Sequence, residues 1–259
     1  MLIALDVGNT ETTLGVFHGE RLATRWRLTT TPLRTPDEWA GAIVAYLTQA
    51  RHAPREVRAA VVASVVPQVT QSVCEAVEHA TGVGPRVVDA RSPLPITLDV
   101  DEPFTVGADR IVNTLAASQL FHRDTIVVDF GTATTFDCIT ADGRFIGGVI
   151  MPGVRTGADD LVRKTAKLPA TELVVPDHVI GRRTEDCIRS GVLWGAADAV
   201  DGLVRRIRAE WPTTQRPHAI ATGGLASLIV PLAREIESVH PDLTLTGLRL
   251  AAAALGLAW

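Results

Sequence analysis

The chain has 259 residues, a formal net charge of −4, 46% hydrophobic residues and 21% charged residues. This length is enough for one large domain or two small ones with a real core, and the composition is that of a soluble globular protein. The acidic balance argues against a general binder of nucleic acid or of anionic membranes, because a phosphate backbone requires a basic surface.

The N-terminal sequence, the uncharged runs and the cysteines indicate where in the cell the protein acts. No basic leader precedes the first strand, and the longest uncharged run is too short and too polar to span a bilayer. The three cysteines are far apart in the sequence and form no Cys-x-x-Cys motif. We therefore expect a cytoplasmic protein with buried thiols and no membrane partner.

The first half of the chain alternates strand and helix patterns. Three strands joined by tight turns precede a helix of amphipathic spacing, an apolar strand typical of burial on both faces, a second helix and a short strand. The predicted elements are strands over 2–8, 12–17 and 21–29, a helix over 38–49 capped by Asp37, a strand over 57–65, a helix over 67–81 and a strand over 86–88.

The second half begins with a long helix and a second hairpin. A loop with two prolines over residues 168–183 separates this hairpin and its following helix from a long helix. The predicted elements are helices over 107–122 and 154–165, a hairpin over 125–149, a helix over 185–208 capped by Thr184, a strand over 219–222, a helix from Ala226, and a strand fragment with an Ala-rich helix over 243–259.

One hairpin pattern occurs twice. Asp6 and Asp129, 123 residues apart, each lie near the end of an apolar strand and open an Asp-x-Gly turn rich in hydroxyl groups. The same offset aligns Gly8 with Gly131, Thr12 with Thr135 and Arg21 with Arg144. Such internal similarity predicts two similar lobes facing each other across a nucleotide.

The residues of this turn fit phosphate binding. Gly8 lets backbone N–H groups approach a phosphate, and Asn9 and Thr10 offer further donors. Asp6 repels phosphate unless a cation lies between them, which implies Mg²⁺ held through water and phosphate oxygens. No Walker A or dinucleotide-binding pattern is present. A single turn of this kind is a weak signal, and the second copy makes it a strong one.

These hairpins resemble those of the actin, sugar-kinase and heat-shock-ATPase superfamily, and within it the type III pantothenate kinases. The segments that carry the resemblance are Asp6–Thr10, Val106–Asn113, Val128–Asp137, Gly147–Gly153, Ile180–Thr184 and Thr222–Ala226. The resemblance implies an α/β fold of two duplicated actin-like (ribonuclease H-like) ATPase lobes with mixed sheets flanked by helices. We expect an N-terminal lobe over 1–115, and a C-terminal lobe over 116–259 with the dimer interface of a homodimer.

The resemblance also implies an activity, the ATP-dependent phosphorylation of pantothenate to 4′-phosphopantothenate at the start of coenzyme A biosynthesis. The residues matching the family's ATP-binding set are Asp6, Val7, Gly8, Asn9, Thr10, Glu11, Thr12, Thr13 and Thr132. Those matching its pantothenate contacts are Gly107, Ala108, Asp109, Arg110 and Thr184. By the same match Asp109 is the catalytic base, and Asp129 holds a monovalent cation, K⁺ or NH₄⁺.

The residue types agree with these roles. A carboxylate with a reference pKa of about 3.9 is a weak base, but the loose transition state of phosphoryl transfer needs positioning more than basicity. Without the resemblance, Asp109 would be interpreted as a helix cap. Arg110 fits a substrate carboxylate or phosphate, and equally a surface ion pair.

The chain departs from the family in one place. Many members carry a Tyr before the Gly-Ala-Asp-Arg motif, where this chain has Val100, and its one tyrosine is Tyr46. Two alternatives stay open: a kinase for another small hydroxyl substrate such as a sugar, and a non-catalytic nucleotide-binding regulator. The intact Asp6, Asp109 and Asp129 favour an enzyme.

Overall fold

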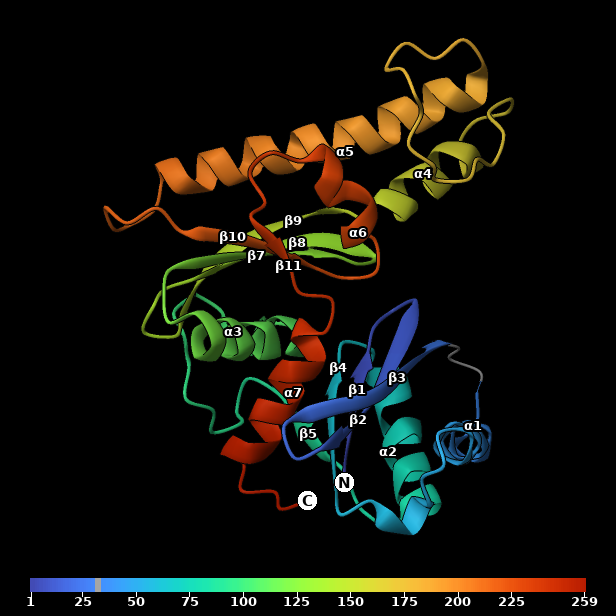
Figure 1. Ribbon diagram of the computed structural model, residues 1–259, viewed down its shortest axis with the longest axis vertical. Coiled ribbons are helices and arrows are strands. Elements are labelled where there is room, and N and C mark those ends of the chain that lie inside the picture. The colour runs from blue at the N-terminus through green and yellow to red at the C-terminus, as the bar shows by residue number, and fades with distance from the viewer. Residues whose placement is uncertain (31–33) are drawn as a thin grey trace. The chain divides into compact units, whose positions relative to one another are not determined.

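The computed structural model describes residues 1–30 and 34–259 and divides into two compact units (Figure 1). The first unit contains residues 1–120 and 243–259, and the second contains residues 121–242. The boundary therefore falls at residue 120 rather than 115. Residues 243–259, expected in the C-terminal lobe, belong to the first unit.

The first unit is built on a mixed sheet of strand order β3-β2-β1-β4-β5. The central strand β1 is antiparallel to β2 and parallel to β4. The strands are β1 (Leu2–Val7), β2 (Glu11–His18), β3 (Arg21–Thr29), β4 (Ala59–Ser64) and β5 (Arg86–Val88), with a short β6 (Thr97–Leu98). The helices are α1 (Pro36–Gln49), α2 (Pro67–Thr81), α3 (Ala108–Phe121) and α7 (Leu243–Ala254), with short 3₁₀ turns at Pro54–Glu56 and Pro103–Thr105.

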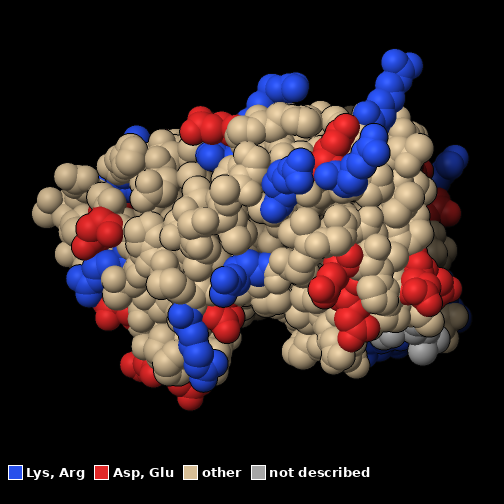
Figure 2. Space-filling model, turned by 90° about the horizontal axis from the view of Figure 1, so that it is seen from below, with Lys and Arg blue, Asp and Glu red and all other residues tan. Residues whose placement is uncertain are grey.

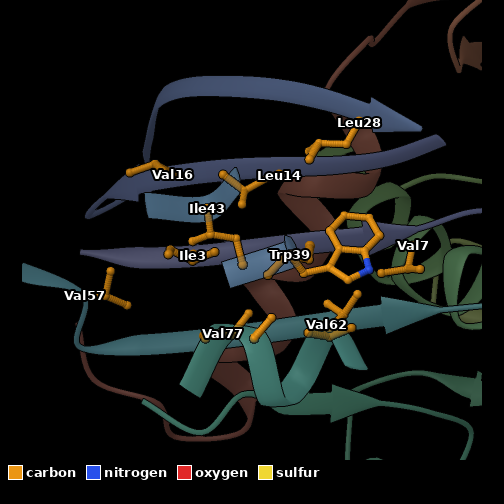
Figure 3. Close-up of a cluster of buried hydrophobic side chains, with 14 of the residues drawn as sticks. Ile3, Val7, Leu14, Val16, Leu28, Trp39, Ile43, Val57, Val62 and Val77 are labelled. Carbon is orange, nitrogen blue, oxygen red and sulfur yellow. The ribbon is translucent and has the colours of Figure 1, made fainter. Parts of the chain in front are cut away.

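One face of this sheet packs against α1 and α2. Ile3 and Val7 of β1 join Trp39 and Ile43 of α1 and Val77 of α2 in one buried cluster (Figure 3). Trp39 is only 1% exposed. Burial of such large apolar side chains is the main favourable contribution to folding, so this cluster fixes β1 against both helices.

The opposite face packs against α3 and α7. Leu2 and Ala4 of β1 lie in a second buried cluster with Ile111 of α3 and Leu248 of α7. Because side chains alternate along a strand, Asp6 projects on this same face, near the carboxyl end of β1. The apolar alternation of β1 thus delivers one carboxylate to the side of the sheet that α3 covers.

The second unit contributes five strands to a mixed sheet, in the order β11-β10-β7-β8-β9. Its α4, α5 and α6 helices share one buried cluster with β7, β8 and β10, including Val128, Phe136 and Leu193. The elements are β7 (Thr125–Phe130), β8 (Ala133–Ile139), β9 (Arg144–Pro152), α4 (Val154–Arg163), α5 (Thr184–Ala209), β10 (His218–Thr222), α6 (Ala226–Ile229), a 3₁₀ turn (Val230–Leu232) and β11 (Ser238–Val239).

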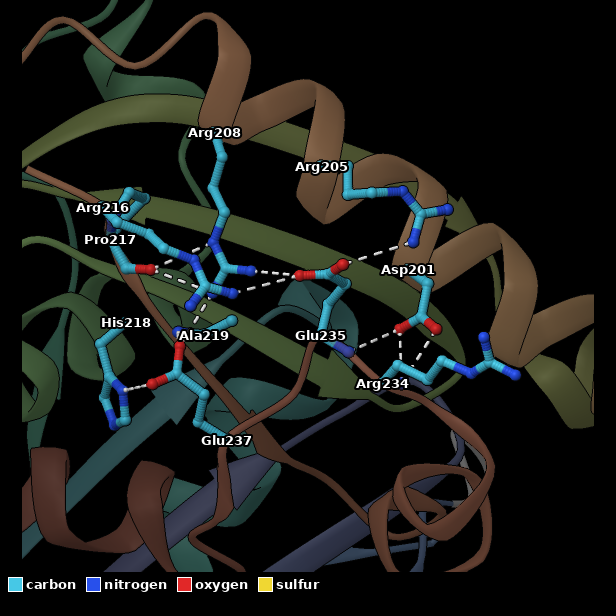
Figure 4. A network of polar contacts seen from close by, with 10 residues as sticks. All are labelled: Asp201, Arg205, Arg208, Arg216, Pro217, His218, Ala219, Arg234, Glu235 and Glu237. Atoms are coloured by element: carbon cyan, nitrogen blue, oxygen red, sulfur yellow. Dashed lines mark hydrogen bonds and ion pairs between the residues drawn. The ribbon is translucent and has the colours of Figure 1, made fainter. Parts of the chain in front are cut away.

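A polar network ties the end of the long helix α5 to β10 and β11 (Figure 4). Arg208, whose side chain is 10% exposed, donates to the Pro217 carbonyl oxygen at 3.1 Å and to Glu237 at 2.8 Å, and it also pairs with Glu235. His218 bonds to Glu237 at 2.9 Å. Guanidinium–carboxylate pairs are directional, so this network fixes where α5 ends relative to the sheet edge.

The chain's surface agrees with its modest net charge. On the face drawn in Figure 2, Lys and Arg side chains are interspersed with Asp and Glu over a largely uncharged surface. Among the described residues, no helix is both long and apolar enough to cross a bilayer.

The start of α1 differs from the prediction. Thr35, not Asp37, is the N-cap: the Thr35 hydroxyl accepts the Glu38 N–H at 3.3 Å, and the Glu38 carboxylate accepts the Thr35 N–H at 2.7 Å. This reciprocal capping box satisfies two of the backbone donors that a helix start leaves open. Asp37 instead lies in the first turn.

Three other elements differ. Thr184 is the first residue of α5 rather than its cap, and Arg183 is the N-cap without a side-chain bond. The helix from Ala226 has a single turn before a 3₁₀ turn begins at Val230. Residues 243–254 form one helix, without the predicted strand fragment.

The capping box predicts a specific stability difference. Thr35→Ala removes the hydroxyl that accepts the Glu38 N–H, keeps the backbone N–H that donates to the Glu38 carboxylate, and should lower the free energy of unfolding by about 1 kcal/mol. Asp37→Ala removes an exposed first-turn charge and its exposed pairing with His79 at 3.9 Å, and should cost less than about 0.5 kcal/mol. Urea denaturation of both variants measures the difference, and equal losses would contradict the assignment of the cap.

Candidate active site

The turn of the first hairpin is short and exposes its backbone. Val7 pairs with Thr12, so the turn consists of residues 8–11. The Gly8 N–H donates to the Glu11 carbonyl oxygen at 3.0 Å, and a Cβ at Gly8 would lie 2.9 Å from that oxygen. Only glycine fits this turn without a shift of the backbone. Asn9 is exposed on it, as phosphate binding requires.

The predicted ATP-binding residues of this hairpin differ in how far their side chains are buried. Asp6 pairs with Thr13 across the two strands, so both side chains lie on the face that α3 covers. Thr12 is fully buried and its hydroxyl bonds to the Thr30 hydroxyl at 2.8 Å, and Val7 is buried as well. Thr12 and Val7 can therefore offer a ligand only their backbone.

The second part of the candidate site is the first turn of helix α3. The Gly107 carbonyl oxygen accepts the Ile111 N–H at 3.1 Å, and Asp109 Oδ1 accepts the Arg110 N–H at 2.8 Å. A Cβ at Gly107 would collide with the Asp109 carboxylate and lie 3.3 Å from Val65 Cγ1. Any larger residue here would displace the Asp109 carboxylate, because that carboxylate folds back over its own helix start.

Burial changes the chemistry of this carboxyl group. Loss of solvent raises the pKa of Asp109 above its ordinary value, and this effect outweighs the opposing influence of the Arg110 N–H and guanidinium. A raised pKa strengthens Asp109 as a proton acceptor, which is the property that a general base needs.

Val65 connects the hairpin with the start of α3. Its N–H donates to the Val7 carbonyl oxygen at 3.1 Å, and its Cγ1 is the atom nearest Gly107 outside that turn. The end of β1 and the first turn of α3 therefore adjoin one residue, at the carboxyl edge of the parallel strands β1 and β4. This edge is where α/β sheets bind their ligands. Val65 belongs to no motif, so the sequence did not single it out.

The second hairpin has a tighter turn than the first. Phe130 pairs with Thr134, which leaves only residues 131–133 in the turn, and the Gly131 N–H donates to the Ala133 carbonyl oxygen at 3.0 Å. Strand pairing therefore matches Thr12 with Thr134, both buried, rather than with Thr135 as the constant offset predicted. The two copies differ by one residue in their turns.

Two contacts from the following helix hold this tighter turn. The Thr132 carbonyl oxygen accepts the Gly153 N–H at 3.1 Å and the Thr156 hydroxyl at 2.7 Å. A Cβ at Gly153 would lie 2.7 Å from the Thr132 carbonyl carbon. The start of α4 thus fixes the backbone of Thr132, which is exposed.

The carboxylate of the second hairpin lies among hydroxyl residues. Asp129 pairs with Thr135 on β8 and with Thr222 on β10. Gly223 has φ +90°, and a Cβ there would lie 2.6 Å from the Phe130 nitrogen and also meet Asp129. Carboxylate and hydroxyl oxygens are suitable ligands for a hard cation.

The predicted site residues therefore fall into two groups, one in each unit. The first unit holds Asp6 to Thr13 and Gly107 to Arg110, joined through Val65. The second unit holds Asp129 and Thr132 on one hairpin, and Thr184 is exposed at the first residue of α5.

A family model described as type III pantothenate kinase matches residues 2–206. The chain belongs to the type III pantothenate kinase family. A relative of that name from Thermomicrobium roseum is 43% identical over 251 residues, covering 97% of this chain and 96% of the relative. Another from Frankia casuarinae is 44% identical, covering 96% of this chain and 98% of the relative.

Solved structures place this family member in the actin-like ATPase fold. Component A of the (R)-2-hydroxyglutaryl-CoA dehydratase of Acidaminococcus fermentans matches with a TM-score of 0.56 and 14% identity, covering 98% of this chain and 96% of that one. The activator of the 2-hydroxyisocaproyl-CoA dehydratase of Clostridium difficile, solved with bound ADPNP, matches with a TM-score of 0.57 and 14% identity, covering 99% and 93%. The expected fold class, two mixed sheets flanked by helices, is confirmed.

The raised pKa of the half-buried Asp109 carboxyl group predicts an unusual pH dependence of stability. A carboxyl pKa raised by folding means that the folded state binds this proton more tightly, so stability falls as pH rises through the unfolded value of about 3.9. Asp109→Asn carries no such proton and should be at least as stable as wild type near pH 7, with the advantage lost below about pH 3.9. Denaturation curves across this pH range test it, and a variant clearly less stable at pH 7 would contradict it.

Proposed function

We propose that this family member transfers the γ-phosphoryl group of ATP to pantothenate, giving ADP and 4′-phosphopantothenate for coenzyme A biosynthesis. The observation that carries this function is the placement of a half-buried Asp109, whose pKa is raised, at the same sheet edge as the Asp6 hairpin. The family match supplies the substrate. The enzyme is an ATP-dependent kinase that acts on an alcohol.

The first unit has two roles in the proposed reaction: it binds the phosphates and it accepts a proton. The Gly8 turn offers its exposed backbone to the phosphates of ATP. Asp109 accepts the proton of the substrate hydroxyl while the oxygen of that hydroxyl bonds to the γ-phosphorus. The bond from that phosphorus to the bridging oxygen breaks, and ADP leaves. Positioning supplies most of the rate, since the transition state is loose.

The residues near this hairpin fit a divalent cation. Asp6 and Thr13 present oxygen atoms on one face beside the Gly8 turn, whose backbone a side chain would block. Mg²⁺ held there through water would neutralise charge on the phosphates. With the cation between them, Asp6 helps to bind the phosphates, whereas without it the carboxylate would repel them.

We propose pantothenate contacts at Gly107 to Arg110. Arg110 carries a positive charge next to the base, and a guanidinium matches the geometry of the substrate's carboxylate. Thr184, exposed at the start of α5, is proposed as a further contact in a homodimer. We expect the enzyme to act in the cytoplasm.

We propose that Asp129 binds a monovalent cation, K⁺ or NH₄⁺, and that Thr132 adds a phosphate contact. The hydroxyl residues Thr135 and Thr222, paired with Asp129, support a site rich in oxygen ligands. The contacts of Gly153 and Thr156 to Thr132 support a rigid turn that holds a ligand without rearrangement.

A coupled ADP-release assay tests the function. Purified enzyme with Mg-ATP should release ADP when pantothenate is added, and not when it is replaced by a panel of sugars. Asp109→Asn should lower kcat by about 100-fold or more, because an amide cannot accept the proton. Release with a sugar alone would favour the alternative kinase, and no release with any alcohol would favour the non-catalytic regulator.

The cation site predicts a salt effect. At constant ionic strength, replacing Na⁺ by K⁺ or NH₄⁺ should raise the rate of the wild type, and Asp129→Asn should remove this stimulation. The same assay measures both. Equal rates in Na⁺ and K⁺, or equal stimulation of the variant, would contradict the assignment of Asp129.

A further inference from the structure

The last helix of the chain lies beside the helix that carries Asp109. α7 packs on β1 and β4, and its Leu245 and Leu248 share a buried cluster with Val112 and Leu115 of α3 (Figure 1). Most contacts in this cluster are apolar and therefore not directional. Alone, they would tolerate small sliding of one helix along the other.

Two contacts in this interface are directional. The Thr244 hydroxyl donates to Asn113 Oδ1 at 2.9 Å, and Asn113 is 1% exposed. Gly247 lies so close to α3 that a Cβ there would be 2.6 Å from the Val112 carbonyl carbon and would overlap the carbonyl oxygen. A partly buried hydrogen bond and a close glycine contact set the register between two helices in a way that apolar packing does not.

Both contacts lie one helix turn after Asp109, the proposed base. Val112 and Asn113 follow Asp109 by three and four residues, so they occupy the next turn of α3 on the same side of the helix. The Ile111 N–H closes the first turn of α3 on the Gly107 carbonyl oxygen, and α-helical hydrogen bonds join this turn to the next one. A shift of this turn along the axis therefore moves Asp109 by the same amount.

We infer that Thr244 and Gly247 of α7 are positioning residues for Asp109, acting through Asn113 and Val112 of α3. The inference rests on the proposed role of Asp109 as the base. No motif of the sequence points to either residue, and neither touches a substrate-binding residue in the described contacts.

Thr244 offers a matched pair of variants. Thr244→Val keeps the branched shape and loses the hydroxyl, and Thr244→Ser keeps the hydroxyl. A displacement of a catalytic group by about 1 Å costs about 100-fold in rate, so Thr244→Val should lower kcat by about tenfold to 100-fold. Thr244→Ser should stay within about threefold of wild type. The KM for ATP should be unchanged in both variants, since α7 keeps its apolar packing on β1, the strand that leads into the phosphate-binding turn.

The pH profile separates positioning from general destabilisation. A looser α3 exposes Asp109 to more water, and burial is what raises its pKa. The acid limb of the kcat profile should therefore move to lower pH in Thr244→Val and return in Thr244→Ser. A variant that only unfolds more easily would lose active enzyme without moving this limb.

Gly247→Ala tests the close contact, with Gly41→Ala as its control. Both glycines lie inside helices, but a Cβ at Gly41 of α1 meets nothing within 4 Å. Gly247→Ala should lower kcat at least as much as Thr244→Val, whereas Gly41→Ala should leave it within about twofold. If Gly247→Ala does not fold, the Thr244 pair decides the matter.

Hydrogen exchange keeps this test separate from the proposed function. The Ile111 N–H, bonded to Gly107, reports on the first turn of α3, and its exchange should quicken in Thr244→Val. If the wild type releases no ADP with pantothenate, the proposed function fails while this readout still tests the register contact. Unchanged exchange, or faster exchange with unchanged kcat and acid limb, would overturn the inference.

Discussion

The burial of β1 on both faces is the constraint on which the first unit depends. Its odd-numbered side chains pack toward α1 and α2, and its even-numbered ones toward α3 and α7. The period-two geometry of a strand leaves Asp6 no choice of face once Leu2 and Ala4 are buried. A shift of one residue in register would bury this carboxylate with Trp39, so the cost of burying a charge protects the site.

The two hairpins show how one motif forms turns of two lengths. In the first, a four-residue turn leaves Asn9 exposed, and Thr12 is turned inward to Thr30. In the second, the turn is one residue shorter, and Thr132 is held from behind by the start of α4. A longer, open turn suits the phosphates of a ligand that comes and goes, whereas a shorter, braced turn suits a fixed ligand geometry.

Much of this was predictable because it is local. Strands over 2–8 and helices over 67–81 follow from periodicity, and the glycines of the site follow from their motifs. Asp37 was mistaken for the cap because Thr35, two residues upstream, forms the reciprocal pair of bonds with Glu38 that caps the helix. The placement of residues 243–259 was not predictable, since α7 packs against segments from the far end of the sequence and no local pattern records such contacts.

The path of the chain gives the α3–α7 contact its importance. The chain leaves the first unit at the end of α3 and returns to it at the start of α7, so both crossings between units lead into these two helices. The Asn113–Thr244 bond joins residues 131 positions apart and lies between the crossings and Asp109. A helix that merely closed the core could have used apolar side chains throughout. Burying the Asn113 amide costs desolvation, and its bond to Thr244 defines the register of the carboxylate one turn away.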